Sequence, residues 1–411
     1  MAITTDSSRN CSGCRACFNI CPVNAITMAY DKHGYPFPQI DKNKCVDCGL
    51  CEKVCPVCSD IIEKNTPVEA YAGRIKDDDA FYNSSSGGAF WAIVKAVISK
   101  DYYVCGAKYD ENLKVITDIG HTLKECEPFR KSKYVLSDLG NCFVRIERLL
   151  KNNEKVLFTA TPCQVSALKN YLKLKNIQSD NLITVDLLCN GVASQALFDE
   201  YLNSYNVCGK PVSSFTFRSK EPINGKTDIR SAMVSFKDGS FKLVTSENDA
   251  YLRGYYWHLF THSLCGKCSY VGRDRVGDIT IGDAWGVGKF CPEVKASKGA
   301  SLILFNTDKG KSLFEDINSE MTLHKLDIND ALESQAILKG ETIAPYRRPV
   351  FFRKHKKYGF EKAVWETGPK SRIKRIHVAV DAFLQKFVAT DICVHVYLQR
   401  SFTFIFTGAL V

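Results

Sequence analysis

The sequence has no long apolar run. A membrane-spanning helix needs roughly 18 consecutive apolar residues, and the best candidate, residues 401–411, is too short. The first ten residues, MAITTDSSRN, are polar and do not resemble a secretory signal peptide. Without an export signal, we expect the protein to lie in the reducing cytoplasm.

Positive charge is not spread along the chain, although the net charge is +10. Residues 347–411 carry 13 Lys or Arg against 4 Asp or Glu, whereas the first 60 residues carry 6 of each. The middle of the chain lacks the basic motifs with interleaved aromatic residues that are typical of nucleic-acid binding. We therefore predict no nucleic-acid partner, and we assign most of the excess charge to the C-terminal tail.

Cysteine is the residue that the sequence has in excess. There are 19 cysteines in 411 residues, and nine of them lie between Cys11 and Cys58. A chain of this length can bury a core without disulfides. In a cytoplasmic protein, cysteines this dense indicate metal or redox chemistry.

Eight of these cysteines form two copies of one motif. The copies are Cys11-x2-Cys14-x2-Cys17-x3-Cys21-Pro22 and Cys45-x2-Cys48-x2-Cys51-x3-Cys55-Pro56. This spacing is that of bacterial ferredoxins with two [4Fe–4S] clusters, in which the fourth cysteine of each copy binds the other cluster. The predicted ligand sets are Cys11, Cys14, Cys17 and Cys55 for one cluster, and Cys45, Cys48, Cys51 and Cys21 for the other. Zinc sites usually take two separated C-x2-C pairs, so zinc fits this spacing poorly.

The remainder of the chain alternates strand and helix patterns. Asp238-Gly239, between alternating apolar residues, predicts a hairpin. Strands are predicted at 155–161, 182–188, 278–282 and 301–306, and helices at 163–172 and 194–205. The alternation predicts an α/β domain with a mixed, partly parallel sheet, placed after a small ferredoxin-like domain.

Three places in this α/β region have the residue types of a binding site. The Ser84–Gly88 loop precedes a helical stretch and could hold an anion on its backbone N–H groups, although plain turns have the same pattern. Thr161-Pro162-Cys163 and Cys189-Asn190-Gly191 follow two buried strands, where ligands bind in open sheets. Cys265-x2-Cys268 has the spacing of a metal or redox pair.

The four cysteines of these last segments, Cys163, Cys189, Cys265 and Cys268, would together make one four-thiolate metal site. Zinc or a thiol–disulfide pair is the alternative there. Cys163 and Cys189 could also be small core residues, which is common for free cysteine. The residues alone leave these readings open.

The same segments occur in the order found in a known family. The chain resembles the coenzyme F420 hydrogenase/dehydrogenase beta-subunit family in Ser84–Gly88, SKYVLSDLG (132–140), TPCQVSAL (161–168), DLLCNGVAS (186–194) and CGKCSYVGRDRVGDITIGDAWG (265–286). Residues 346–364 are similar to the family's C-terminal end, so the resemblance covers about residues 8–364. Members of the family are iron–sulfur flavoproteins that bind FAD and one or more [4Fe–4S] clusters. Known members exchange electrons with a deazaflavin coenzyme or reduce other substrates.

The resemblance implies a third [4Fe–4S] cluster on Cys163, Cys189, Cys265 and Cys268. It also implies an FAD site formed by Ser85, Ser86, Gly87, Gly88, Thr161, Pro162, Asn190, Gly191, Arg275 and Asp283. The family typically has His where this chain has Asn190, and the change removes a titratable group. The resemblance therefore indicates the path of the electrons more firmly than it indicates the substrate.

The resemblance indicates an oxidoreductase that passes electrons between a reduced organic donor, FAD and three clusters. The alternative is a non-catalytic electron-transfer subunit whose substrate site lies on another protein, with cell-surface polysaccharide synthesis as one setting. In either case the expected partner is a redox protein or a small-molecule electron donor or acceptor.

The predicted organisation is a ferredoxin-type domain and a two-part α/β body with a basic tail. The ranges are 1–58 for the cluster domain, 59–68 for a linker, 69–175 and 176–350 for the two parts of the body, and 351–411 for the tail. In the tail, apolar residues recur at helical spacing among basic ones: Ile373, Ile376, Val380, Phe383, Leu384 and Phe387. Such a helix can lie on an anionic membrane surface, but more often it packs on its own domain or on a partner.

Overall fold

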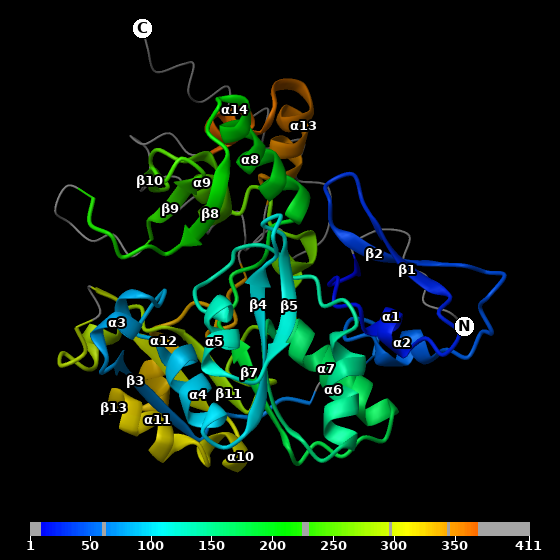
Figure 1. The fold of residues 1–411 in the computed structure, drawn as a ribbon, viewed down its shortest axis with the longest axis vertical. Coiled ribbons are helices and arrows are strands. Elements are labelled where there is room, and N and C mark those ends of the chain that lie inside the picture. The colour runs from blue at the N-terminus through cyan, green and yellow to red at the C-terminus, as the bar shows by residue number, and fades with distance from the viewer. Residues whose placement is uncertain (1–9, 60–62, 224–229, 296–297, 343–345, 369–411) are drawn as a thin grey trace, which may run out of the picture.

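The computed structural model describes residues 10–59, 63–223, 230–295, 298–342 and 346–368, and Figure 1 shows how they are arranged. An N-terminal module of short helices and one hairpin lies beside an eight-stranded sheet. A three-stranded sheet with its own helices forms a further layer above the end of the large sheet. The mixed α/β architecture predicted from the alternating pattern is confirmed.

The N-terminal module has two similar halves. Helices α1 (Ala16–Ile20) and α2 (Leu50–Val54) each follow a residue with left-handed backbone, and each ends at the cysteine that precedes a proline. Strands β1 (Ile26–Tyr30) and β2 (Pro36–Ile40) pair antiparallel between the two helices. A proline after each last cysteine cannot continue the helix, so the fourth thiol of each motif turns away from the first three.

The large sheet is mixed. Its strand order is β13-β3-β12-β11-β7-β6-β4-β5, and β4, β6, β7 and β11 run parallel to one another. The remaining strand pairs are antiparallel. The bounds are β3 (Glu69–Ile75), β4 (Tyr102–Tyr109), β5 (Val115–Gly120), β6 (Lys155–Ala160), β7 (Leu182–Leu187), β11 (Ile279–Asp283), β12 (Ser301–Phe305) and β13 (Met321–Leu326).

Helices cover both faces of this sheet because successive strand residues point to opposite faces. In β6, Leu157 packs in the core under α4 and α11, whereas Val156 and Phe158 pack under α6 and α7. The bounds of the helices around the sheet are α3 (Asp78–Tyr82), α4 (Ala89–Ile98), α5 (Leu123–Cys126), α6 (Cys142–Lys151), α7 (Pro162–Leu174), α10 (Asp308–Lys311), α11 (Phe314–Glu320) and α12 (Ile328–Glu333).

The upper layer is built around aromatic side chains. Strands β8 (Val212–Phe217), β9 (Ala232–Phe236) and β10 (Phe241–Val244) form an antiparallel sheet. The predicted hairpin turn at Asp238-Gly239 is confirmed, since it joins β9 to β10 and Gly239 has φ of 83°. The helices of this layer are α8 (Gln195–Val207), α9 (Ala250–Tyr256), α13 (Arg348–Tyr358) and α14 (Phe360–Thr367).

The N-terminal module packs against α6, α7 and the loops at the carboxyl ends of the parallel strands. Arg15 Nη2 donates to Asp138 Oδ2 at 2.5 Å, and Asn19 Nδ2 donates to the Gly140 carbonyl at 3.0 Å. At the hairpin tip, the buried hydroxyl of Tyr35 donates to the Val192 carbonyl at 3.3 Å. These contacts place the ferredoxin-like cysteines next to the edge of the sheet where ligands bind.

Two predictions concern contact with a membrane. The predicted amphipathic helix at residues 373–387 lies outside the described residues. Among the helices that the structure does describe, none combines the length and the apolar character needed to cross a bilayer.

Candidate functional site

The first cysteine set is assembled as the motif predicts. Cys11, Cys14 and Cys17 come from the loop before α1 and from α1 itself, and Cys55 ends α2; all four line one hollow. Burial and then the neighbouring thiols raise the pKa of Cys11 and of Cys14 to about 12. Burial is the larger cause, and the neighbouring thiols add to it because like charges held close together raise one another's pKa.

The second cysteine set lies nearer to the surface. Cys21, Cys45, Cys48 and Cys51 line a second hollow with Val23 and Val46. The backbone N–H of Ala25 donates to Cys21 Sγ at 3.2 Å. Cys48 is exposed, and Val46 is 60% exposed, so this set has a solvent-facing side.

The third cysteine set comes from three separate segments. Cys163 lies in the first turn of α7, and Cys189 follows β7. Cys265 lies in a short 3-10 helix (Ser263–Lys267), which ends at Cys268. All four line one small cavity of about 80 Å³. Burial raises the pKa of Cys163 to about 12 and of Cys189 to about 11; the Cys189 and Cys268 thiols add to the first shift, and Cys268 adds to the second.

Each set offers hydrogen-bond donors to its sulfurs. The Gly13 N–H donates to Cys11 Sγ at 3.4 Å, and the Tyr270 N–H donates to Cys268 Sγ at 3.4 Å. In the third set, the N–H groups of Gly191 and Val192 also donate to Cys189 and Cys265. Such bonds, in apolar surroundings, are features that tune iron–sulfur clusters.

The spacing of the thiols also bears on the metal. Within the described ranges, no group of three or more His, Cys, Asp or Glu side chains is arranged to hold a single metal ion. A cubane cluster keeps its four thiolates farther apart than one ion does. Each set offers four thiolates, which are the ligands of a [4Fe–4S] cluster.

The first and third sets are neighbours. The thiols of Cys14 and Cys163 are close enough to raise the pKa of Cys14. Tyr270 lies between the two sets, since both sets raise its pKa and its hydroxyl donates to the Pro56 carbonyl at 3.2 Å. Cys17 and Cys55 of the first set pack in one cluster with Cys51 and Cys21 of the second, so the three sets form a series from the sheet edge to the surface of the N-terminal module.

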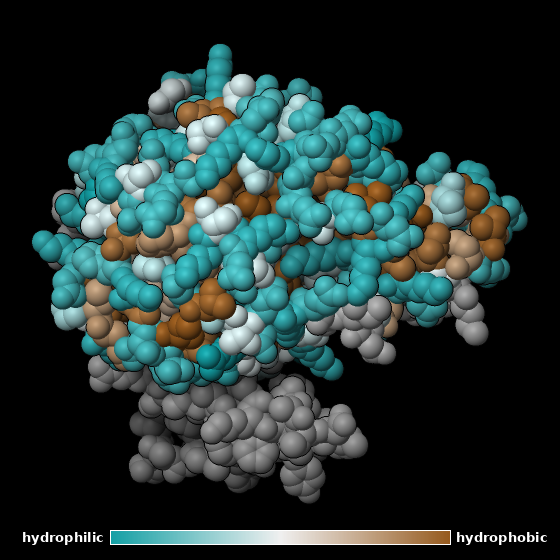
Figure 2. All heavy atoms as spheres, turned by 90° about the horizontal axis from the view of Figure 1, so that it is seen from below, coloured by the Kyte–Doolittle hydropathy of each residue, from teal (hydrophilic) through white to brown (hydrophobic). Residues whose placement is uncertain are grey.

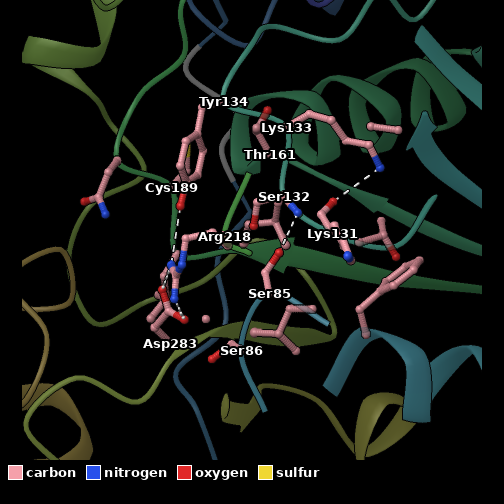
Figure 3. Close-up of a pocket in the computed structure, with 18 of the residues that line it drawn as sticks. Ser85, Ser86, Lys131, Ser132, Lys133, Tyr134, Thr161, Cys189, Arg218 and Asp283 are labelled. Atoms are coloured by element: carbon pink, nitrogen blue, oxygen red, sulfur yellow. Dashed lines mark hydrogen bonds and ion pairs between the residues drawn. The ribbon is translucent and has the colours of Figure 1, made fainter. Parts of the chain in front are cut away.

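A large cavity lies on the other side of the third set. Its volume is about 480 Å³, and it opens at the carboxyl ends of β6, β7 and β11 (Figure 3). It shares a wall with the small cavity, formed by Thr161, Cys189, Asn190, Gly191, Val192 and His258. The volume lies in the range of cofactor sites, about 300–1,000 Å³.

Most residues expected around a flavin line this cavity. Ser85, Ser86, Gly88, Thr161, Asn190, Gly191 and Asp283 do so, and Pro162 lines the small cavity instead. Gly87 packs against the backbone of Gly73 and Ser301, where a Cβ would approach within 2.3 Å, and it does not line the cavity. Arg275 does not line either cavity; it is buried beside Asp186. The expectation that Gly87 and Arg275 face the flavin is therefore not supported by their positions.

The structure adds cationic groups that the sequence analysis did not assign. Lys131 and Lys133 border the cavity beside the serine loop, and Ser85 Oγ accepts from the Ser132 N–H at 2.8 Å (Figure 3). Lys133 Nζ donates to the carbonyls of Pro128 and Arg130 at 2.9 and 2.7 Å, which fixes the loop that carries Lys131. Burial, followed by the charge of Arg130, lowers the pKa of Lys131. In the sequence, the run KSKY (131–134) was the signal that could have revealed these two cations.

Aromatic and titratable side chains form the remainder of the wall. Arg218 forms two bonds to Asp283, at 2.6 and 3.0 Å, and donates to the Tyr134 hydroxyl at 3.3 Å. Tyr134 stacks on Tyr255 with ring centres 4.3 Å apart. His258, which borders both cavities, has its pKa lowered to about 4 by burial and is neutral near pH 7. Of these residues, Asp283 was expected from the resemblance, whereas the positions of Arg218, Tyr255 and His258 were not available from the sequence.

The fold and the cysteine sets define an iron–sulfur electron-transfer protein with a mixed α/β body. The family model that describes the C terminus of the beta subunit of coenzyme F420 hydrogenase/dehydrogenase matches residues 153–331, and a "4Fe-4S dicluster domain" model matches residues 10–58. The resemblance to the coenzyme F420 hydrogenase/dehydrogenase beta-subunit family is therefore confirmed over residues 153–331, and that to a two-cluster ferredoxin-type module over residues 10–58.

Two curated relatives match different parts of the chain. The F subunit of the F(420)H(2) dehydrogenase of Methanosarcina mazei is 24% identical over 334 residues, which are 76% of this chain and 84% of that protein. The ferredoxin 7Fe of Hydrogenibacillus schlegelii is 36% identical over 66 residues, 16% of this chain and 78% of that protein. The chain is thus an iron–sulfur protein of the oxidoreductase type, related to a component of an F420H2 dehydrogenase.

One solved structure is also similar to part of the chain. It is a xenon-derivatised F420-reducing [NiFe] hydrogenase complex from Methanosarcina barkeri, in which the matching chain is 16% identical. The match covers 72% of this chain and 94% of that chain, with a TM-score of 0.46.

Proposed function

We propose that the protein is an iron–sulfur flavoprotein that transfers electrons between a reduced organic donor and a protein partner. The donor would bind at the large cavity, and the electrons would pass through three [4Fe–4S] clusters. The observation that carries the proposal is the continuity of the sites. The large cavity adjoins the third cysteine set, which adjoins the first set, and the second set reaches the surface.

The large cavity has the features of a flavin site. When bound there, FAD would exchange two electrons with an organic donor and single electrons with a cluster. Lys131 and the positive N-terminal end of α4, whose first residues border the cavity, would hold the phosphates. The paired rings of Tyr134 and Tyr255 offer an apolar wall for a flat ring system.

The cavity also has room for the ring of an electron donor. Trp285 borders it and is 41% exposed, with the Arg218 guanidinium 5.5 Å from the centre of its ring. An exposed aromatic side chain at a cavity provides a surface on which a planar donor can stack. The family suggests a reduced deazaflavin as the donor. Reduced nicotinamide is the second donor to test.

Electrons would leave through the second cysteine set. Cys48 and Val46 are exposed, and Figure 2 shows hydrophobic side chains on the lobe that projects at the right of the view, where Figure 1 places the N-terminal module. An apolar surface directly over a one-electron centre suits transient docking of a redox protein. This places the protein partner at the module and the organic donor at the body.

Anaerobic purification with measurement of iron, sulfide and flavin tests the proposal. About twelve irons and one FAD per chain are expected, since each of three clusters holds four irons. Reduced deazaflavin should then bleach the cluster absorbance in stopped-flow mixing. About eight irons without flavin would overturn both the third cluster and the flavin site. Twelve irons without flavin would instead favour the non-catalytic electron-transfer subunit.

A further inference from the structure

A buried charge pair lies beside the third cysteine set. Arg275, just before β11, is 1% exposed, and Asp186, in β7, is fully buried. Arg275 Nη2 and Asp186 Oδ1 are 3.4 Å apart. An unpaired charge in such surroundings would be strongly destabilising, so each of these residues requires the other.

The guanidinium of Arg275 connects the two loops that carry Cys189 and Cys268. Its Nη1 donates to the Tyr270 carbonyl at 2.8 Å, and its Nη2 donates to the Leu187 carbonyl at 3.2 Å. Leu187 precedes Cys189 by two residues, and Tyr270 follows Cys268 by two and donates its N–H to that sulfur at 3.4 Å. The planar fork of arginine suits two carbonyl groups at fixed positions, which a lysine cannot match.

Both charges lie close to the thiols of this set, because the two carbonyls that Arg275 binds are each two residues from a cysteine, Cys189 or Cys268. A positive charge at this place favours the electron added to a reduced cluster, and the carboxylate of Asp186 opposes it. Asp186 is held in place because Oδ2 accepts from the N–H groups of Val276 and Gly277, both at 3.2 Å.

We propose that Arg275 and Asp186 set the reduction potential of the third cluster. Arg275 acts as a positioning residue that holds the two cysteine loops and supplies a positive charge, and Asp186 limits the effect of that charge. This inference rests on the third cluster of the proposed function. One-electron reduction adds one negative charge to the site, with no bond formed and no proton moved. Net charge near a cluster and hydrogen bonds to its ligands are the established determinants of its potential.

The test is an anaerobic redox titration of the full-length holoprotein, followed by electron paramagnetic resonance. Arg275→Met should shift the midpoint potential of the third cluster to lower values, and Asp186→Asn should shift it to higher values. The double variant should lie between the two single variants. Arg275→Lys keeps the charge and should shift the potential less than Arg275→Met. The two ferredoxin-type clusters serve as internal references in each sample, and their midpoint potentials should stay unchanged.

A control for the loss of a cation is Lys95→Met. Lys95 is part-buried on α4, and its Nζ donates to Glu320 Oε2 at 2.9 Å on the face of the sheet that α4 and α11 cover, opposite α7. This variant should leave the potential of the third cluster unchanged.

Opposite shifts in Arg275→Met and Asp186→Asn cannot come from loosened packing alone. Unchanged potentials in both variants, or shifts of the same sign, would overturn the inference while the third cluster stands. If Arg275→Met does not retain the cluster, the potentials of Arg275→Lys and Asp186→Asn test the inference instead. Shifts of opposite sign support it, and unchanged potentials or shifts of the same sign overturn it. A parent protein with about eight irons would overturn the third cluster itself, and iron analysis detects that case before any titration.

Discussion

The first and third cysteine sets each bring four thiols together, but the chain assembles them in different ways. Three members of the first set lie within seven residues, and the α1 and α2 turns gather them almost without help from the remainder of the molecule. The third set draws on α7, the end of β7 and the turn at Cys265–Cys268, which only the sheet brings together.

The two regions also differ in what else stabilises them. The cysteines of the N-terminal module are themselves much of its buried core, together with Ile26 and a few partly buried neighbours. The body has large aliphatic and aromatic cores on both faces of its sheet. A small module with so little apolar core depends on its metal for folding, whereas a large domain does not.

Removal of iron should produce the largest difference in stability between the N-terminal module and the body. Chelation under reducing conditions should lower the hydrogen-exchange protection of residues 10–59 by at least about 100-fold, equivalent to about 2.7 kcal/mol. The amides of β6 and β7 should keep most of their protection because both faces of these strands pack on large apolar cores, of which Cys14, Cys163 and Cys268 are a small part. Equal loss of protection in both regions would contradict the difference described here.

Loss of one ligand in the body should remove iron without unfolding the body. Cys265→Ala is expected to lose about four irons per chain while the free energy of unfolding of the body changes by no more than about 1 kcal/mol. Iron analysis and thermal unfolding measure the two effects. Cys208→Ala is the control, since Cys208 is exposed and belongs to none of the three sets; it should keep all of the iron.

The body should also differ from the module in binding an organic anion. Lys131→Met should weaken FAD binding about 10- to 100-fold, because a charge-assisted hydrogen bond contributes about 1.5–3 kcal/mol. Fluorescence titration of flavin-free protein measures the affinity. Lys44→Met on the N-terminal module, where the side chain is 65% exposed, should leave it unchanged. An equal effect of both substitutions would show that only overall charge matters.

The smallest expected effect concerns the exposed side of the module. Val46→Asp should slow electron transfer to a one-electron protein acceptor such as cytochrome c by a few-fold, since it places a charge on an apolar docking surface. Stopped-flow rates at matched cluster content give the comparison. Val207→Asp alters a valine on α8 that is more exposed, 88% against 60% for Val46, and should have no effect. A slower rate in both variants would place the docking surface elsewhere.

Local spacing explains which features could be predicted. The two ferredoxin-type motifs, the strands at 155–161 and 182–188 and the Asp238-Gly239 turn depend on neighbours a few residues away, and the structure has strands and a turn at those places. The flavin expectations for Gly87 and Arg275 came from position in a motif. Motif position did not reveal that Gly87 packs against a strand or that Arg275 connects two loops.

The sequence by itself determined the two cluster motifs and the alternating α/β pattern, because each is encoded by short-range spacing. Only the tertiary structure decided that Cys163, Cys189, Cys265 and Cys268 share one cavity and that Lys131 borders the next one. The same holds for the contact between the first and third sets. These contacts join segments about 25 to 150 positions apart, and they form because parallel strands bring their carboxyl ends to one edge of the sheet.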